Sequence, residues 1–281
     1  MDFKSLRARL GGPGGLKDRF RLELGSVLAL SVAAGGLFAF ARIADEVVEG
    51  DTHGFDRAVM LALRTAGDTN DPIGPAWFES AMRDVTSLGS VTVLAILTLA
   101  AIAYLLMDGK RGAALLVAGS VGGGTLLSSV LKMGFERPRP DLVAHMVDVH
   151  TLSFPSGHAM MSAVTYLTLG VLLARVSAKR RVKVFVVALG VLLTLAVGGS
   201  RVYLGVHWPT DVLAGWSVGA AWAMMCWLVA RRLQQKGKVE QPDAPAGSGP
   251  VDDQDPDRAE ASKSDDLQPP MAKDARMVTN R

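Results

Sequence analysis

The hydrophobic residues of this chain are concentrated in six long runs that contain no charged residue. The runs extend over residues 24–41, 85–107, 112–131, 156–174, 184–200 and 212–230. Each is close to the ~20 apolar residues that a helix needs to cross the hydrocarbon core of a bilayer. Lipid offers no hydrogen-bond partners, so such a run must pair its own backbone groups, as a helix does. The pattern predicts an all-α integral membrane protein, a bundle of six transmembrane helices.

The polar stretch between the first two runs, residues 42–84, carries an amphipathic pattern. Apolar residues recur at helical spacing on both sides of a break at residues 72–75: Phe55, Val59, Met60 and Leu63 before it, and Trp77, Phe78, Met82 and Val85 after it. This spacing predicts two short amphipathic helices that lie on the membrane surface. They either shape an entrance for a lipid or cap the bundle, and the pattern leaves both roles open.

Basic residues indicate how the spans are oriented. They cluster before the first run, in the connections 108–111 and 177–183, and after the last run. Basic loops stay in the cytoplasm, so both termini are predicted there, and the loops 42–84, 132–155 and 201–211 are predicted on the outer face. A basic N-terminus before an apolar run is also typical of a cleaved signal peptide, but the length of this run favours a retained anchor.

Composition agrees with a membrane protein and changes the interpretation of the charge. Hydrophobic residues make up 49% of the chain, and the mean hydropathy is +0.26. The isoelectric point near 9.1 does not indicate nucleic-acid binding, because the basic residues lie at the ends of spans. We expect three parts: a basic cytoplasmic N-terminus (1–23), a six-span domain (24–235), and a Pro-, Asp- and Lys-rich tail (236–281) that is disordered in the cytoplasm.

Three polar clusters fall at the predicted outer ends of the spans, where polar residues are rarely without a function. They contain three cations, Lys132, Arg139 and Arg201. Arginine offers a planar fork of donors to phosphate oxygens, and lysine adds a point charge. Ser156 and Gly157 stand at the start of the fourth run, where free backbone amides and the helix dipole favour an anion. The clusters together predict a phosphate-binding site.

Two histidines and an aspartate in these clusters suit phosphate transfer. His207 and Asp211 are four residues apart, at a spacing that can place both side chains on one face of a helix. A carboxylate bonded to one ring nitrogen fixes the tautomer and leaves the other nitrogen free as a nucleophile. His158 would face the same pocket and could protonate the leaving oxygen. The remaining histidines, His53, His145 and His150, are expected to be loop residues.

These residues resemble the signature of the type 2 phosphatidic acid phosphatase superfamily, K-x6-R-P, P-S-G-H and S-R-x5-H-x3-D. Here the signature is Lys132-x6-Arg139-Pro140, Pro155-Ser156-Gly157-His158 and Ser200-Arg201-x5-His207-x3-Asp211. The resemblance covers roughly residues 50–230. It implies a six-span bundle in a bacterial inner membrane and a metal-independent phosphatase without a cofactor.

Carried over residue by residue, the resemblance makes His207 the nucleophile that becomes phosphohistidine. Asp211 would orient His207, and His158 would protonate the leaving lipid oxygen. The phosphate oxygens would be held by the remaining residues of the signature: Lys132, Arg139, Ser156, Gly157 and Arg201.

Several alternatives stay open from the sequence alone. Phosphatidic acid, phosphatidylglycerol phosphate, undecaprenyl diphosphate and a phosphorylated glycolipid would all suit the cations as substrates. The same site could serve a phosphotransferase that passes phosphate to a second lipid. An anion transporter would need polar residues along the spans, and these are almost absent. Gly119-x-x-x-Gly123 and Gly215-x-x-x-Gly219 are typical of helix packing, within one chain or between copies, so the oligomeric state is open.

Overall fold

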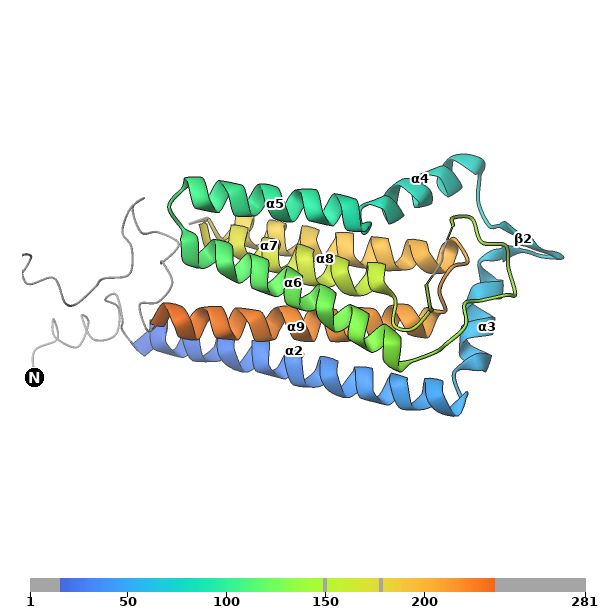
Figure 1. Ribbon diagram of the computed structural model, residues 1–281, viewed down its shortest axis with the longest axis horizontal. Coiled ribbons are helices and arrows are strands. Elements are labelled where there is room, and N and C mark those ends of the chain that lie inside the picture. Colours follow the sequence, from blue (N-terminus) through green and yellow to red (C-terminus); the bar gives the residue numbers. More distant parts are fainter. Residues whose placement is uncertain (1–15, 149–150, 177–178, 236–281) are drawn as a thin grey trace, which may run out of the picture. The chain divides into compact units, whose positions relative to one another are not determined.

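The computed structural model describes residues 16–148, 151–176 and 179–235 of the chain. The predicted tail at 236–281 and the first 15 residues lie outside this part. The described residues belong to one compact unit, Met1–Gly249, and are almost entirely helical (Figure 1). The elements in chain order are α2 (Leu16–Glu49), α3 (His53–Ala62), β1 (Arg64–Thr65), β2 (Asp68–Pro72), α4 (Ala76–Ser87), α5 (Val91–Met107), α6 (Arg111–Gly134), α7 (Gly157–Val176), α8 (Arg180–Tyr203) and α9 (Pro209–Gln235).

The long helices form a bundle whose apolar side chains face outward. Helix α7 packs against α5, α6, α8 and α9, while α2 lies along α9 (Figure 1). Large apolar side chains on the outside of the bundle are widely exposed, including Phe38 (70%), Leu115 (74%) and Phe185 (64%). An apolar surface of this extent would drive aggregation in water and is stable against lipid tails. The prediction of an all-α integral membrane protein is confirmed.

The sequence pattern suggested that the second apolar run is one straight helix, but the structure divides this run between two helices. Residues 85–87 complete α4, and α5 begins at Val91 after a break at which the two helices bend by 48°. Ser90 causes the restart, because its hydroxyl accepts a hydrogen bond from the amide of Val93 and so caps the N-terminus of α5. Five described helices are long and apolar enough to cross a membrane, and the bent α4–α5 pair would make a sixth.

Residues 50–90, between α2 and α5, contain the two predicted amphipathic helices, α3 and α4, and are called the outer segment below after their predicted position. A short antiparallel hairpin of β1 and β2, which the sequence pattern did not predict, joins them. Figure 1 shows α3, the hairpin and α4 together at one end of the bundle. The same end holds the C-terminus of α6 and the N-terminus of α7, which carry the first two motif clusters.

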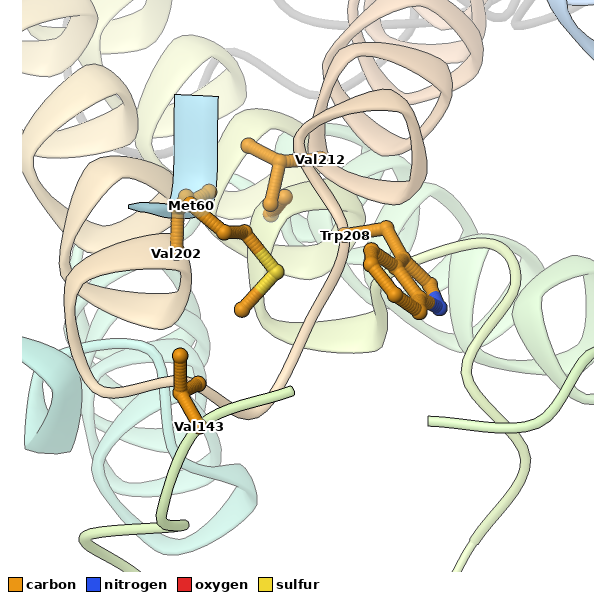
Figure 2. Packing of buried hydrophobic residues seen from close by; sticks show 6 residues of the cluster. Met60, Val143, Val202, Trp208 and Val212 are labelled. Carbon is orange, nitrogen blue, oxygen red and sulfur yellow. The ribbon is translucent and has the colours of Figure 1, made fainter. Parts of the chain in front are cut away.

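A cluster of buried apolar side chains fixes the outer segment to the bundle. Met60 of α3 packs with Val143, Val202, Trp208 and Val212, which come from the α6–α7 connection, α8, the α8–α9 connection and α9 (Figure 2). Met60 has no exposed surface. Burial of a methionine side chain contributes about 1.5–3 kcal/mol. Helix α3 is therefore packed into the core.

Small residues bring α7 and α9 into backbone contact. A Cβ atom at Gly219 would lie 2.6 Å from the carbonyl oxygen of Met160, and one at Gly215 would lie 2.7 Å from that of Ser156. Only glycine permits this approach, so the predicted packing role of Gly215-x-x-x-Gly219 is confirmed. In the second motif, a Cβ at Gly123 would meet the Trp222 ring, but one at Gly119 would meet nothing within 4 Å.

We predict that Gly219→Ala lowers the free energy of unfolding by about 1–3 kcal/mol, because the added methyl group forces α7 and α9 apart. Gly119→Ala is the matched control: it makes the same substitution in a helix but meets open space. The control is expected to leave stability unchanged or to raise it by up to about 1 kcal/mol. Thermal unfolding in detergent measures the difference, and equal midpoints for the two variants would contradict the packing role of Gly219.

Candidate active site

The motif clusters meet at a polar cavity at the end of the bundle. The cavity has a volume of about 340 Å³, within the range of about 300–1,000 Å³ that is usual for small-ligand sites. Of the eight residues predicted from the sequence, the following six line it: Lys132, Arg139, Gly157, His158, Arg201 and His207. They come from α6, α7, α8 and the connections between these helices. Residues up to 75 positions apart in the chain, from 132 to 207, thus share one wall.

Asp211 lies behind His207 and is fully buried. Its Oδ2 atom is 3.3 Å from Nδ1 of His207, and it also accepts hydrogen bonds from the Trp208 amide at 2.9 Å and from the Ser153 hydroxyl. The pair forms in a different way from that predicted, because α9 begins at Pro209 and His207 precedes the helix. Asp211 lies in the first turn and reaches back to the residues before it, as N-terminal side chains of helices commonly do.

The hydrogen bonds of His207 define its tautomer. Arg139 Nη1 lies 3.2 Å from His207 Nε2, and a guanidinium can only donate. Nε2 therefore carries a lone pair, and Nδ1–H donates to Asp211. The nitrogen that faces the cavity is thus the one able to attack an electrophile.

Burial lowers the pKa of His207 to about 4 and outweighs the hydrogen bond to Asp211, which acts in the opposite direction. With this pKa, the His207 imidazole is neutral at pH 7. Burial also lowers the pKa of Arg139, and the negative charge of Asp211 partly offsets that decrease.

The three cations are held in different ways. Arg139 donates to the carbonyl oxygens of Thr151 (2.7 Å) and Val206 (2.6 Å), which fix its guanidinium beside His207. Lys132 Nζ donates to Thr151 Oγ1 at 3.2 Å. Arg201 donates to Thr86 Oγ1 at 3.1 Å, and its buried Nε has no partner within the described part of the chain. Arg201 also lines the cavity.

The start of α7 places Gly157 and His158 at the cavity but not Ser156. The Ser156 amide donates to the carbonyl oxygen of Asp211 at 3.0 Å, which joins this turn to α9. The Ser156 hydroxyl is fully buried, accepts from the Ala159 amide at 3.5 Å and does not line the cavity. Its position is that of a helix cap. A Cβ at Gly157 would lie 3.4 Å from Lys132, so the backbone is close to this cation.

Hydroxyl groups from the α4–α5 break also line the cavity, which sequence reasoning did not foresee. Thr86, Ser87 and Ser90 form this part of the wall. A Cβ at Gly89 would lie 3.2 Å from the His158 ring and 2.4 Å from Val197. The break therefore packs closely against the histidine. A run of small polar residues inside an apolar stretch was the available signal.

Two further charged residues were also missed, Arg137 and Asp56. Arg137 Nη1 donates to Asp211 Oδ1 at 2.6 Å, and its Nη2 donates to Asp56 Oδ2 at 2.7 Å. Asp56 stands on the face of α3 that carries Met60, and both are buried. The spacing of Asp56 four residues before Met60 could have indicated that this carboxylate is buried, but nothing in the sequence indicated that Arg137 is its partner.

Two of the remaining histidines lie apart from the cavity wall. His53 is exposed, as expected, but it begins α3 and does not lie in a loop, and His145 Nε2 bonds to the carbonyl oxygen of Pro140 at 2.6 Å. His150 lies outside the described residues. Neither His53 nor His145 lines the cavity.

We predict that the imidazole of His207 stays neutral at pH 5.5, where an ordinary histidine with a pKa near 6.5 is mostly protonated. The reason is burial, which penalises the charged ring. Nitrogen-15 chemical shifts of histidine-labelled protein in detergent measure the protonation, and the spectrum of His207→Gln assigns the signal. A ring that protonates at pH 6 or above would contradict the lowered pKa.

Comparison with known proteins places this site in a family. The family model of the PAP2 superfamily matches residues 113–235. Phosphatidylglycerophosphatase B of Bacillus subtilis is 39% identical over 146 residues, which are 51% of this chain and 70% of that protein. The undecaprenyl-diphosphatase of Sulfolobus acidocaldarius is 43% identical over 68 residues, 24% of this chain and 29% of that protein.

A solved structure extends the similarity to the fold. The crystal structure described as the first transmembrane PAP2 type phosphatidylglycerolphosphate phosphatase from Bacillus subtilis superimposes with a TM-score of 0.59 at 30% identity. The similarity covers 74% of this chain and 96% of that one. The similarity in sequence and in fold establishes that this chain belongs to the PAP2 superfamily and is an integral membrane phosphatase.

Proposed function

We propose that this protein removes phosphate from a membrane lipid through a covalent phosphohistidine intermediate. The observation that carries the proposal is the cavity wall, on which the lone pair of His207 Nε2 faces a space bounded by three cations. A phosphate group in this space would meet a neutral nucleophile and positive charge together. Preorganised charge of this kind is usually the largest contribution to catalysis.

In the proposed first step, His207 Nε2 attacks phosphorus and forms an N–P bond while the P–O bond to the lipid breaks. His158 gives its proton to the lipid oxygen, which would otherwise leave as a poor alkoxide. The imidazole becomes positively charged, and Asp211 stabilises that charge through the Nδ1–H bond. Water then attacks phosphorus and gives a proton back to His158, while the N–P bond breaks, its electron pair returns to Nε2, and inorganic phosphate leaves.

Phosphate binding changes the bonds of Arg139. An N–H of Arg139 points at the lone pair of His207 Nε2. A phosphate that approaches Nε2 takes this place, and the guanidinium can turn its N–H to a phosphate oxygen. Arg201 and Lys132, which also line the cavity, supply further donors, while the Gly157 backbone lies beside Lys132.

Phosphatidylglycerol phosphate is the substrate we place first, and phosphatidic acid and undecaprenyl diphosphate are the next candidates. The similarity to phosphatidylglycerophosphatase B extends over 70% of that protein, against 29% for the undecaprenyl-diphosphatase. The hydroxyls of Ser87 and Ser90 on the wall would also suit a glycerol group beside the phosphate. Transfer of the phosphate to a second lipid uses the same intermediate and is the alternative outcome.

We predict that His207→Ala loses essentially all release of phosphate from these lipids, by at least about 10³-fold. His53→Ala, in which an exposed histidine outside the cavity is replaced, is the matched control and should keep full activity. Purified enzyme is assayed in detergent with each lipid in turn and with excess EDTA, since the proposed nucleophile and phosphate ligands are side chains. Turnover by a folded His207→Ala variant, or loss of wild-type activity in EDTA, would contradict the proposal.

We further propose that the cavity opens on the extracytoplasmic side of a bacterial inner membrane, as the basic loops indicate. Alkaline phosphatase fused after Gly67, in the outer hairpin, is expected to be active, because its disulfides form only outside the cytoplasm. The matched fusion after Gly109, in the turn between α5 and α6, is expected to be inactive. The reverse pattern of activity would invert the proposed topology.

A further inference from the structure

Three buried charged side chains form a connected cluster behind His207. Arg137 lies between two carboxylates, with Nη1 2.6 Å from Asp211 Oδ1 and Nη2 2.7 Å from Asp56 Oδ2. Asp56 and Asp211 have no exposed surface, and Arg137 is 9% exposed. Further hydrogen bonds join the cluster to its surroundings: Asp56 accepts from the amide and the hydroxyl of Thr210 at 2.9 and 2.7 Å, and Arg137 donates to Thr52.

The cluster joins three parts of the chain that the sequence does not bring together. Asp56 comes from α3, Arg137 from the connection after α6, and Asp211 from the first turn of α9. Asp56 lies outside residues 113–235, which match the family model. Arg137 lies between Lys132 and Arg139 but is not one of the fixed positions of the signature. A buried ion pair is also a poor source of stability, because desolvation offsets most of its attraction.

The charges of the cluster do not cancel. Two carboxylates and one guanidinium leave one net negative charge, directly behind the Nδ1–H of His207. On the proposed function, attack on phosphorus puts one positive charge on this ring. The cations Lys132, Arg139 and Arg201 lie on the other side, on the cavity wall, where the phosphate oxygens would balance them. The cluster therefore has the charge that the phosphorylated imidazole needs.

We propose that Asp56 and Arg137 are positioning residues that set the charge behind the nucleophile. Arg137 holds Asp211 in place through a short bond, and Asp56 neutralises Arg137 so that the charge of Asp211 stays available to His207. Neither Asp56 nor Arg137 lines the cavity or reaches the reacting atoms. Helix α3 of the outer segment thereby takes part in the chemistry of the bundle. This inference rests on the proposed function of the same site.

The test compares variants that differ in the charge of the cluster. Asp56→Asn makes it neutral, so we expect kcat to fall roughly 10- to 100-fold, with KM changed less than about threefold. The double variant Asp56→Asn with Arg137→Gln returns the net charge to minus one and is expected to recover at least about tenfold in kcat over Asp56→Asn. A merely structural role predicts the opposite order, because the double variant removes more of the buried network.

Single Arg137→Gln is not used for this comparison, because it leaves two carboxylates buried without a cation. Two controls complete the set. Thr52→Val removes a hydrogen bond to Arg137 without a change of charge and should lower kcat less than about threefold. Arg42→Gln removes two exposed ion pairs on α2, with Asp45 and Glu46, and should leave kcat unchanged. Thermal unfolding of each variant in detergent establishes that it is folded.

A second measurement separates this inference from the proposed function. The rate at which diethyl pyrocarbonate modifies His207, followed by mass spectrometry at pH 7, reports the nucleophilicity of Nε2 without a lipid. We expect Asp56→Asn to slow this reaction and the double variant to restore it. If the reaction rates with diethyl pyrocarbonate follow this order but no lipid releases phosphate, the result would support the charge balance of the cluster and refute the proposed removal of phosphate from lipids. Phosphate release by the wild type, with the double variant no faster than Asp56→Asn in either assay, would overturn the charge balance alone.

Discussion

The buried carboxylate of Asp211 is the group on which the arrangement of the site depends. A charge without exposed surface is costly unless its oxygens are fully bonded, and here they accept from His207, Trp208, Ser153 and Arg137. These donors come from the α6–α7 and α8–α9 connections. The segments must therefore close around one carboxylate in a single geometry. The same bonds that satisfy Asp211 orient the ring of His207 toward the cavity.

The surroundings of the site explain how a polar centre survives at the end of an apolar bundle. Along the helices the outer surface is apolar, and α7 and α9 meet through glycines that allow backbone contact. Lipid gives no hydrophobic drive for helices to associate, so close packing of this kind holds the spans together. Gly157 and His158 stand at the N-terminus of α7, and Asp211 stands in the first turn of α9, so the packed α7–α9 pair holds all three. Fixed helices thus supply the precision that the chemistry needs.

The outer segment supplies residues to the core, to the buried charge cluster and to the cavity wall. Helix α3 contributes Met60 to the core and Asp56 to the buried charge cluster, while the α4–α5 break contributes Thr86, Ser87 and Ser90 to the cavity wall. These residues lie before the matched residues 113–235. On the proposed function, the phosphate would contact residues within the match, and the group next to it would contact residues before the match.

The sequence by itself determined the class of fold, the family and half of the residues that line the cavity. Apolar runs of membrane length force helices, since lipid leaves backbone groups no other partner. The signature residues fall at the ends of these helices, so Lys132, Arg139, Gly157, His158, Arg201 and His207 could be assigned to one site from local pattern alone. The structure places these six residues on one cavity wall, and each assignment rests on the chemistry of a short stretch of chain.

Only the tertiary structure decided which groups stand behind that wall. Asp56 and Arg137 are 81 positions apart, and no local pattern relates them. The break that divides the second apolar run depends on the Ser90 cap and on the fit of Gly89 against His158. Ser156 was expected at the phosphate, but its hydroxyl caps α7 and lies outside the cavity wall. Two of these features, the bond between Asp56 and Arg137 and the fit of Gly89 against His158, are contacts between distant segments, and hydrophobic pattern and spacing contain no information about such contacts.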